Sequence, residues 1–286
     1  MFLWAICFPL ITVGIAMAPH LYFAAMRALV AGCALLILAF MLGRPAPRGK
    51  NVWLYILIVG FGATTLGFLG MVHAAEFIAP GIATVIANTQ PLMAAVLAYP
   101  ILSERLSGRG KLGLIMGFGG IVLVTLPQLQ FTGANGYLSG VAYILLAAFG
   151  ITISNVIIKR LAGKVDALMA MGWQLILGAV PLWIATWIYE EPASTVWSGQ
   201  FLLILLLLSL LGTALVYYLW FSVLEKVQLN HANAFSFLIP IFGLTMGFLF
   251  YSERFGWLEI AGIGLTLAGI VQVNRTESPS LKKTVQ

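Results

Sequence analysis

The sequence predicts an all-α integral membrane protein with ten transmembrane helices arranged as two inverted five-helix repeats. Of the 286 residues, 61% are hydrophobic and only 8% are charged, and the mean hydropathy is +1.02. This composition is far outside that of soluble domains. In addition, residues 81–124 match residues 230–273 at one fixed offset (230 − 81 = 149), which indicates an internal repeat.

The aligned positions of the repeat combine a proline with a charged tripeptide. Pro91 falls on Pro240, and Ser103-Glu104-Arg105 falls on Ser252-Glu253-Arg254. Each proline lies about ten residues into an apolar run, about 15 Å from either end of a helix and so near the bilayer midplane. Because five spans per unit is an odd number, the second copy must enter the membrane upside down. Inverted repeats are typical of alternating-access transporters.

Apolar runs of about twenty residues, separated by polar or Gly/Pro-marked turns, predict each helix in order. The expected spans are 2–18, 21–42, 52–73, 81–102, 110–126, 137–158, 165–188, 201–224, 231–251 and 256–273. The chain then divides into a first repeat at 1–126, a connecting loop at 127–136, a second, inverted repeat at 137–273 and a polar cytoplasmic tail at 274–286.

The distribution of charge predicts the orientation. With ten spans, 13 of the 15 Lys and Arg residues fall in loops and in the tail on one side, whereas Arg254 is the loop cation of the other side. The positive-inside rule makes the first side, with both termini, cytoplasmic. We expect an integral plasma membrane protein, in a bacterium the inner membrane, with an external loop at Glu190-Glu191.

The two prolines are candidate hinges beside a substrate site. Pro91 and Pro240 cannot donate to the preceding turn, so they free backbone acceptors at Ala87 and Ser236. Freed acceptors at membrane depth need protein, water or ligand as a partner. The same helix faces carry further candidate substrate-binding residues, which are Thr84, Asn88, Tyr99, Asn233 and Phe237. The alternative is that the two asparagines hold helices together through hydrogen bonds.

Aromatic and amide side chains on the seventh and eighth helices are further candidates for substrate binding. Tyr217 and Tyr218 lie about seven residues from the cytoplasmic end of their helix, roughly 10 Å deep. That depth favours a binding wall over an interfacial belt. Trp173 and Gln174 lie at similar depth and are candidates of the same kind.

Titratable groups are scarce within the predicted spans. No Asp or Glu falls in the middle of a span, although proton-driven carriers commonly use a buried carboxylate. His73 is the remaining substrate-binding or proton-relay candidate, and Arg27 with Glu76 is the candidate outer gate or a structural ion pair. Two ligands, His73 and Glu76, do not make a metal site, so neither a metal nor a cofactor is expected.

Glycines are dense in the fifth and tenth spans. They are Gly113, Gly117 and Gly120, and Gly262, Gly264 and Gly269. Small residues at such spacing let helix backbones approach closely. We expect these two helices to pack between halves or between subunits. The Ser-Glu-Arg tripeptides are expected to be polar turns that anchor the next helix.

At these residues the chain resembles the EamA family of the drug/metabolite transporter superfamily. The family pattern of small residues, a proline, Ser or Gly before Glu-Arg, and a Gly-rich final helix occurs at 83–120 and again at 232–269. The resemblance implies ten helices in two inverted repeats and export of small metabolites. Amino acids, including aromatic ones, are a frequent class, and exporters of the YddG type are nearest. His73 and Glu76 depart from the family pattern.

The predicted function is therefore export of a small molecule by alternating access, with the substrate between the third, fourth, eighth and ninth helices. The expected partners are that substrate, an amino acid or related metabolite, and the lipid bilayer, for a monomer that binds no nucleic acid. The alternatives are another metabolite class, such as nucleosides or drugs, a passive facilitator without proton coupling, and a scaffold. An enzyme is not expected, because no span combines a nucleophile with a base.

Overall fold

The computed structural model of the chain describes residues 1–90, 92–93, 108–131, 134–227, 232 and 235–276. Every element in these ranges is helical, which confirms the all-α prediction for the described part of the chain. Five helices there are long and apolar enough to cross a membrane, at 20–41, 50–74, 136–161, 167–189 and 199–226. Shorter apolar helices cover 2–15, 238–251 and 257–272.

The helices of the first half follow the predicted order. They are α1 (Phe2–Ala5), α2 (Cys7–Ile15), α3 (His20–Met41), α4 (Lys50–Val59), the π-helical segment η1 (Gly60–Leu66), α5 (Gly67–Ala74), α6 (Pro80–Ala87) and α8 (Gly108–Phe131). Pro80 is the first residue of α6, where a missing N–H leaves no helical bond unmade. In the expected span 81–102, residue 91 and residues 94–102 lie outside the described residues.

The helices of the second half follow those of the first along the chain. They are α9 (Ala134–Leu161), α10 (Ala167–Tyr189), η2 (Pro192–Ser194), α11 (Gly199–Leu206), the π-helical η3 (Leu207–Leu215), α12 (Val216–Lys226), η4 (Phe235–Phe237), α14 (Leu238–Tyr251) and α15 (Trp257–Thr276). The connection between halves is shorter than the expected loop at 127–136, because α8 continues through Pro127 to Phe131 and α9 begins at Ala134.

The π-helical segments occupy matching places in the two halves. Shifting η1 by the repeat offset gives 60 + 149 = 209 to 66 + 149 = 215, which falls inside η3. In η3 the hydroxyl of Thr213 donates to the carbonyl of Leu208, 2.8 Å away and five residues earlier. In η1 the hydroxyl of Thr65 donates to the carbonyl of Gly178, 2.7 Å away in α10. Such segments are frequent at functional sites.

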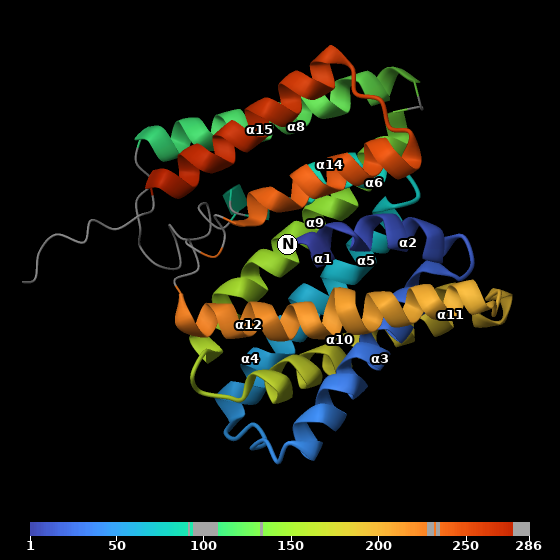
Figure 1. Cartoon of the computed structure of the whole chain (residues 1–286), viewed down its shortest axis with the longest axis vertical. Helices are drawn as coiled ribbons and strands as arrows, with labels where there is room; N and C mark the ends of the chain where they lie inside the picture. The colour runs from blue at the N-terminus through green and yellow to red at the C-terminus, as the bar shows by residue number, and fades with distance from the viewer. Residues whose placement is uncertain (91, 94–107, 132–133, 228–231, 233–234, 277–286) are drawn as a thin grey trace, which may run out of the picture.

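The packing pairs helices with their counterparts in the other half (Figure 1). In the figure α8 and α15 run side by side at one end of the molecule, with α6 and α14 as the next layer. Near the opposite end α3 packs along α10. Each pair joins segments that the offset of 149 relates, or that belong to related spans. This pattern is consistent with a pseudo-two-fold relation between the halves.

Glycines hold α8 and α15 at backbone distance, as predicted for these two helices. A Cβ at Gly120 would lie 2.5 Å from the carbonyl oxygen of Gly262, and one at Gly262 would lie 2.6 Å from the carbonyl oxygen of Gly120. A Cβ at Gly269 would lie 2.6 Å from the carbonyl oxygen of Gly113. A side chain at any of these three glycines would overlap the facing backbone.

The hydrophobic core consists of two clusters of buried residues. The larger cluster joins α3, α10 and the eighth span around Phe23, Phe201 and Phe221, whose side chains are fully buried. The smaller cluster joins α6, α8 and α9 around Ile86, Val124 and Ile144. Both clusters include residues of α2 and α5.

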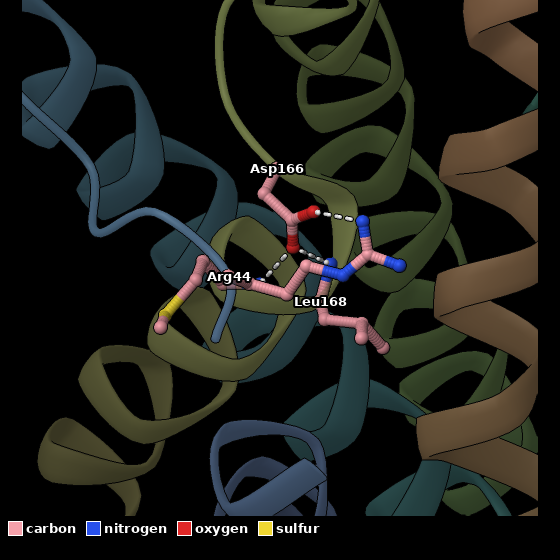
Figure 2. Close-up of polar contacts among 4 residues, drawn as sticks. Arg44, Asp166 and Leu168 are labelled. Carbon is pink, nitrogen blue, oxygen red and sulfur yellow. Dashed lines mark hydrogen bonds and ion pairs between the residues drawn. The ribbon is translucent and has the colours of Figure 1, made fainter. Parts of the chain in front are cut away.

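Carboxylates at the surfaces cap helix N-termini. Asp166 Oδ1 accepts hydrogen bonds from the N–H groups of Leu168 (3.0 Å) and Met169 at the start of α10, and its Oδ2 lies 3.7 Å from Nη1 of Arg44 (Figure 2). Glu190 caps α3, because its two oxygens accept from the N–H groups of Leu21 and Tyr22, each at 2.8 Å. Acidic groups at helix starts are favourable because the helix dipole is positive there.

Glu253 joins the two halves in the same way. Its Oε1 accepts from the N–H of Gly81 at the start of α6, 2.9 Å away, and its own N–H donates to the carbonyl of Gly247. The preceding Ser252 has a φ of 52°, which a non-glycine residue rarely adopts. The second Ser-Glu-Arg tripeptide therefore anchors a helix of the other half rather than the next helix, which corrects the sequence-based expectation. The first tripeptide, 103–105, lies outside the described residues.

Replacing Gly120 with alanine should destabilise the protein. The new methyl group would overlap the backbone of α15, which typically lowers the free energy of unfolding by about 1–3 kcal/mol. The matched control is Gly119→Ala, where the Cβ would lie 3.9 Å from Leu265 and the better helix propensity of alanine should stabilise by up to about 1 kcal/mol. Thermal unfolding in detergent should separate the two variants, and equal midpoints would contradict this packing.

Glu253 should make stability depend on pH. Burial raises the pKa of its carboxyl above the usual 4.5, the N–H groups of Gly81 and Ile82 oppose that rise, and the Glu259 carboxylate adds to it. The native state then holds the proton more tightly than the unfolded state. The stabilisation is fully present below about pH 4.5 and is lost as the pH rises through the raised native pKa.

The Glu253→Gln variant tests that dependence. Glutamine keeps an acceptor for the N–H of Gly81 but does not titrate. We expect the fall in melting temperature from about pH 4.5 to 8 to be smaller in this variant than in the wild type. Glu191→Gln, at an exposed loop position, is the control and should keep the wild-type slope. An unchanged slope in Glu253→Gln would assign the pH dependence to another group.

Candidate functional site

A small cavity lies between helices of both halves. Its volume is about 60 Å³, which is room for a few water molecules. The residues that line it are Trp4, Cys7, Phe8, Arg27, Phe68, Met71, Ala87, Asn88, Gln90, Ile151, Gly212, Tyr217, Trp220, Ser236 and Ile239. Their side chains are mostly apolar, and none of them is a carboxylate.

The third, fourth, eighth and ninth spans contribute to this cavity, where sequence analysis expected the substrate. Phe68 comes from α5, Asn88 from the turn after α6, Tyr217 from α12 and Ile239 from α14. The first and sixth spans also contribute, through residues such as Trp4 and Ile151, and were not predicted, because apolar residues give no signal that separates a cavity wall from a surface facing lipid. The second span contributes Arg27. Ala87 and Ser236, whose carbonyls the prolines were expected to free, both line the cavity.

Arg27 is the charged group of the cavity wall. It lies seven residues into α3, about 10 Å from the helix start, and only 3% of it is exposed. Its Nε donates to the hydroxyl of Thr213 in η3, 2.8 Å away, and its Nη2 lies 3.6 Å from the sulfur of Cys7. Its guanidinium carbon is 4.4 Å from the centre of the Phe68 ring. Its Nη1 is buried and has no hydrogen-bond partner.

The expected gate of Arg27 and Glu76 is not formed in this structure. Glu76 follows the end of α5 and is exposed, and the ion pair among the described residues joins Arg44 to Asp166 instead. Arg27 points to η3 and α2 because its neighbours there are Thr213 and Cys7. A cation within an apolar span is in itself a signal for a functional site, and that signal would have placed Arg27 correctly.

His73 lies away from the cavity, in a cluster of rings near the start of α3. Its Nδ1 is 2.9 Å from the carbonyl oxygen of Leu69. Its ring meets His20 edge-on at 5.4 Å and lies 5.1 Å from the ring of Tyr143. His20 is thus a neighbour of His73, whereas Arg27 contacts Thr213 and Cys7 instead.

Asn88 is the candidate of the fourth span that reaches the cavity. Its side chain is 4% exposed, and its Nδ2 has no hydrogen-bond partner. Thr84 does not line the cavity. Its hydroxyl donates to the carbonyl of Gly81, 2.6 Å away, and the side chain packs on Gly243 of α14. Pro240 is buried within α14 and also lies off the cavity wall.

Three candidates, Pro91, Tyr99 and Asn233, lie outside the described residues, as does the side chain of Phe237.

Of the aromatic candidates, Tyr217 lines the cavity. Its hydroxyl donates to the carbonyl of Ala63, 3.2 Å away, and its ring stacks on Phe68 at 6.4 Å. Tyr218 is half-buried and does not line the cavity. Trp220, which sequence analysis did not single out, does so. Its Nε1 donates to Oδ1 of Asn155 (2.8 Å), and its ring meets Trp4 edge-on at 5.2 Å.

The two candidates of the seventh span make contacts between helices. The ring of Trp173 meets Trp53 at 5.3 Å. Gln174 is buried, and its Oε1 accepts from the hydroxyl of Thr64, 2.8 Å away in η1. Neither residue lines the cavity.

Comparison with known proteins identifies relatives over most of the chain. The model of the EamA-like transporter family matches residues 1–126 and 138–275. A chloroplastic WAT1-related protein of Arabidopsis thaliana is 32% identical over 90% of this chain, which spans only 63% of that protein's length. An uncharacterized transporter of Synechocystis sp. is 28% identical over 96% of this chain and 88% of its own. The protein PecM of Dickeya dadantii is 26% identical over 92% and 86%.

A solved crystal structure shares the fold. It matches with a TM-score of 0.67 over 96% of this chain and 95% of its own, at 18% sequence identity. The two stretches matched by the family model together cover nearly the whole chain, and each holds one of the two halves described above. The chain therefore belongs to the EamA-like transporter family and is an integral membrane transporter.

Proposed function

We propose that the protein is a carrier that exports a small organic metabolite by alternating access, with two inverted five-helix repeats moving around the central cavity. The observation that carries the proposal is that residues of both halves enclose one cavity with a buried cation in its wall. The alignment of η1 with η3 and the pairing of counterpart helices support the inverted repeat.

The size of the cavity supports a closed conformation. Pockets that hold small ligands usually have volumes of about 300–1,000 Å³, whereas this cavity has about 60 Å³. A metabolite must therefore enter a more open arrangement of the same walls. A carrier passes through closed and open arrangements in each cycle, whereas a permanently open pore does not.

A second cavity suggests where the path continues. It has a volume of about 430 Å³ and shares Trp4 and Trp220 with the first. Phe2, Leu219 and Phe235 line it and are exposed, so it opens to the surface. The edge-on pair of Trp4 and Trp220 lies between the two cavities and is the proposed inner gate.

Amino acids, including aromatic ones, are the first substrates to test, because the sequence resembles exporters of that type. The aromatic walls of the cavity, which include Phe68 and Trp220, suit a substrate with an apolar body. Nucleosides and drugs remain the alternative classes.

The test is counterflow in proteoliposomes. Vesicles loaded with an unlabelled solute are diluted into the same solute with a label, using a panel of amino acids, aromatic carboxylates and nucleosides. A carrier should accumulate label transiently above equilibrium, whereas a passive facilitator should only equilibrate it. Absence of an overshoot for every solute that enters would contradict alternating access.

Asn88→Leu should weaken substrate binding in the same assay. The amide lines the cavity with a free donor, and loss of a hydrogen bond to a buried partner costs about 1–3 kcal/mol. The matched control is Gln174→Leu, which removes a buried amide that bonds to Thr64 and does not line the cavity. The control should lower stability and leave affinity unchanged. The opposite pattern would make Asn88 a contact between helices.

The orientation can be tested by cysteine labelling in intact cells. The background carries Cys7→Ser and Cys33→Ser, because Cys33 is exposed. A membrane-impermeant maleimide should label Ser194→Cys, in the exposed segment η2, and should reach Arg48→Cys only after permeabilisation. The reverse pattern would place both termini outside.

A further inference from the structure

We propose that the central cavity binds the carboxylate of an apolar organic anion through Arg27, and that the ligand needs no ammonium group. The proposal rests on the proposed function, since it takes this cavity as the transport site. It narrows the substrate class from amino acids to carboxylates with an apolar body.

The guanidinium of Arg27 lacks a partner at one nitrogen. Its Nε is bonded to Thr213 and its Nη2 lies at the sulfur of Cys7, but Nη1 is buried with no acceptor. Arginine stays protonated in proteins, so the group cannot become neutral to escape this environment. A buried charge is tolerated when an opposite charge and hydrogen bonds compensate it. A hydroxyl, a thiol and the face of Phe68 supply no negative charge.

The described carboxylates are engaged elsewhere. Of the nine Asp and Glu residues, Glu104 and Glu277 lie outside the described residues, which leaves 9 − 2 = 7. Asp166, Glu190, Glu253 and Glu259 accept hydrogen bonds from N–H groups near the starts of α10, α3, α6 and α15, Glu225 lies at the N–H of Gly163, and Glu76 and Glu191 are exposed. None of the seven forms an ion pair with Arg27. No described residue therefore supplies the compensating negative charge, and in this proposal an anion from outside the chain supplies it.

The other residues of the cavity wall indicate which other chemical groups the ligand has. Asn88 provides a second unpartnered N–H donor in the same wall, so the buried side chains of the wall that lack a partner are both donors, which suits a carboxylate. No acidic side chain lines the cavity to pair with an ammonium. Trp4, Phe68 and Trp220 offer ring surface to an apolar body. An aromatic or aliphatic monocarboxylate satisfies each of these features.

A matched set of four probes tests the proposal on purified protein in detergent. They share a phenyl body and differ in charge: 3-phenylpropionate, 3-phenylpropanamide, phenylalanine and 2-phenylethylamine. Isothermal titration calorimetry should give the carboxylate a Kd at least about tenfold lower than the amide, since a charge-assisted hydrogen bond contributes that much or more. The amine should bind more weakly than the amide, and phenylalanine no more tightly than 3-phenylpropionate.

Variants of Arg27 test whether this residue causes the preference for the carboxylate over the amide. In Arg27→Met the advantage of the carboxylate over the amide should fall to less than about twofold, and Arg27→Lys should keep part of it because the charge remains. Arg44→Met is the matched control, since it removes an arginine from the exposed ion pair with Asp166, and it should keep the full preference. The melting temperature of ligand-free Arg27→Met should not fall, because the variant removes an uncompensated buried charge.

Two results would overturn the proposal. One is that the wild-type protein binds the amide as tightly as the carboxylate. This measurement does not depend on whether a variant folds. The other is an Arg27→Met protein that is less stable but keeps the carboxylate preference, which would make Arg27 a structural contact to Thr213 and Phe68.

Counterflow separates this proposal from the proposed function. If labelled solutes accumulate transiently above equilibrium but 3-phenylpropionate does not inhibit this accumulation in an Arg27-dependent way, the transport proposal stands and the anion-site proposal is wrong. If 3-phenylpropionate binds in an Arg27-dependent way while no labelled solute accumulates above equilibrium, the anion-site proposal stands and the transport proposal is wrong.

Discussion

The structure depends on the requirement that polar groups at membrane depth find partners inside the protein, because lipid offers none. Helix starts near the membrane surfaces have a similar need, and there Glu190 and Glu253 accept from N–H groups that a helix leaves free. Thr65 meets it in the π segment by bonding across to α10. Arg27 does not meet it fully. The cavity is thus the place where the chain leaves a strong donor for a molecule from outside to satisfy.

Much of the helical framework could be predicted from the sequence because long apolar runs have one stable form in a bilayer. The expected span 21–42 is α3 at 20–41, and 165–188 is α10 at 167–189. Glycine spacing also predicted the close approach of α8 and α15. The π segments were not predicted, because 60–66 and 207–215 continue the apolar runs of the flanking helices without a charged residue or a proline.

The candidate site was only partly predictable, because sequence gives depth along a helix but not the neighbour that a side chain meets. Asn88 and Tyr217 line the cavity, and their role in substrate binding stays a prediction. Arg27 and Glu76 seemed close in depth, yet Glu76 lies beyond the end of α5 while Arg27 turns toward η3. The contact of Glu253 with Gly81 joins residues 172 positions apart. No periodicity within one helix encodes such a contact.

The glycine contacts also distinguish helix pairs that meet through their backbones from the layer of α6 and α14, which is held by side chains. Backbone meets backbone between α8 and α15, and a Cβ at Gly60 would lie 2.5 Å from the carbonyl oxygen of Gln174 in α10. Helices locked at that distance cannot slide or part without leaving a void. The layer of α6 and α14 is held instead by the side chains of Thr84 and Glu253. Side chains can change rotamer, so we expect any widening beside Asn88 to occur in this layer. One of its two contacts is made by the carboxyl group of Glu253, whose pKa burial raises.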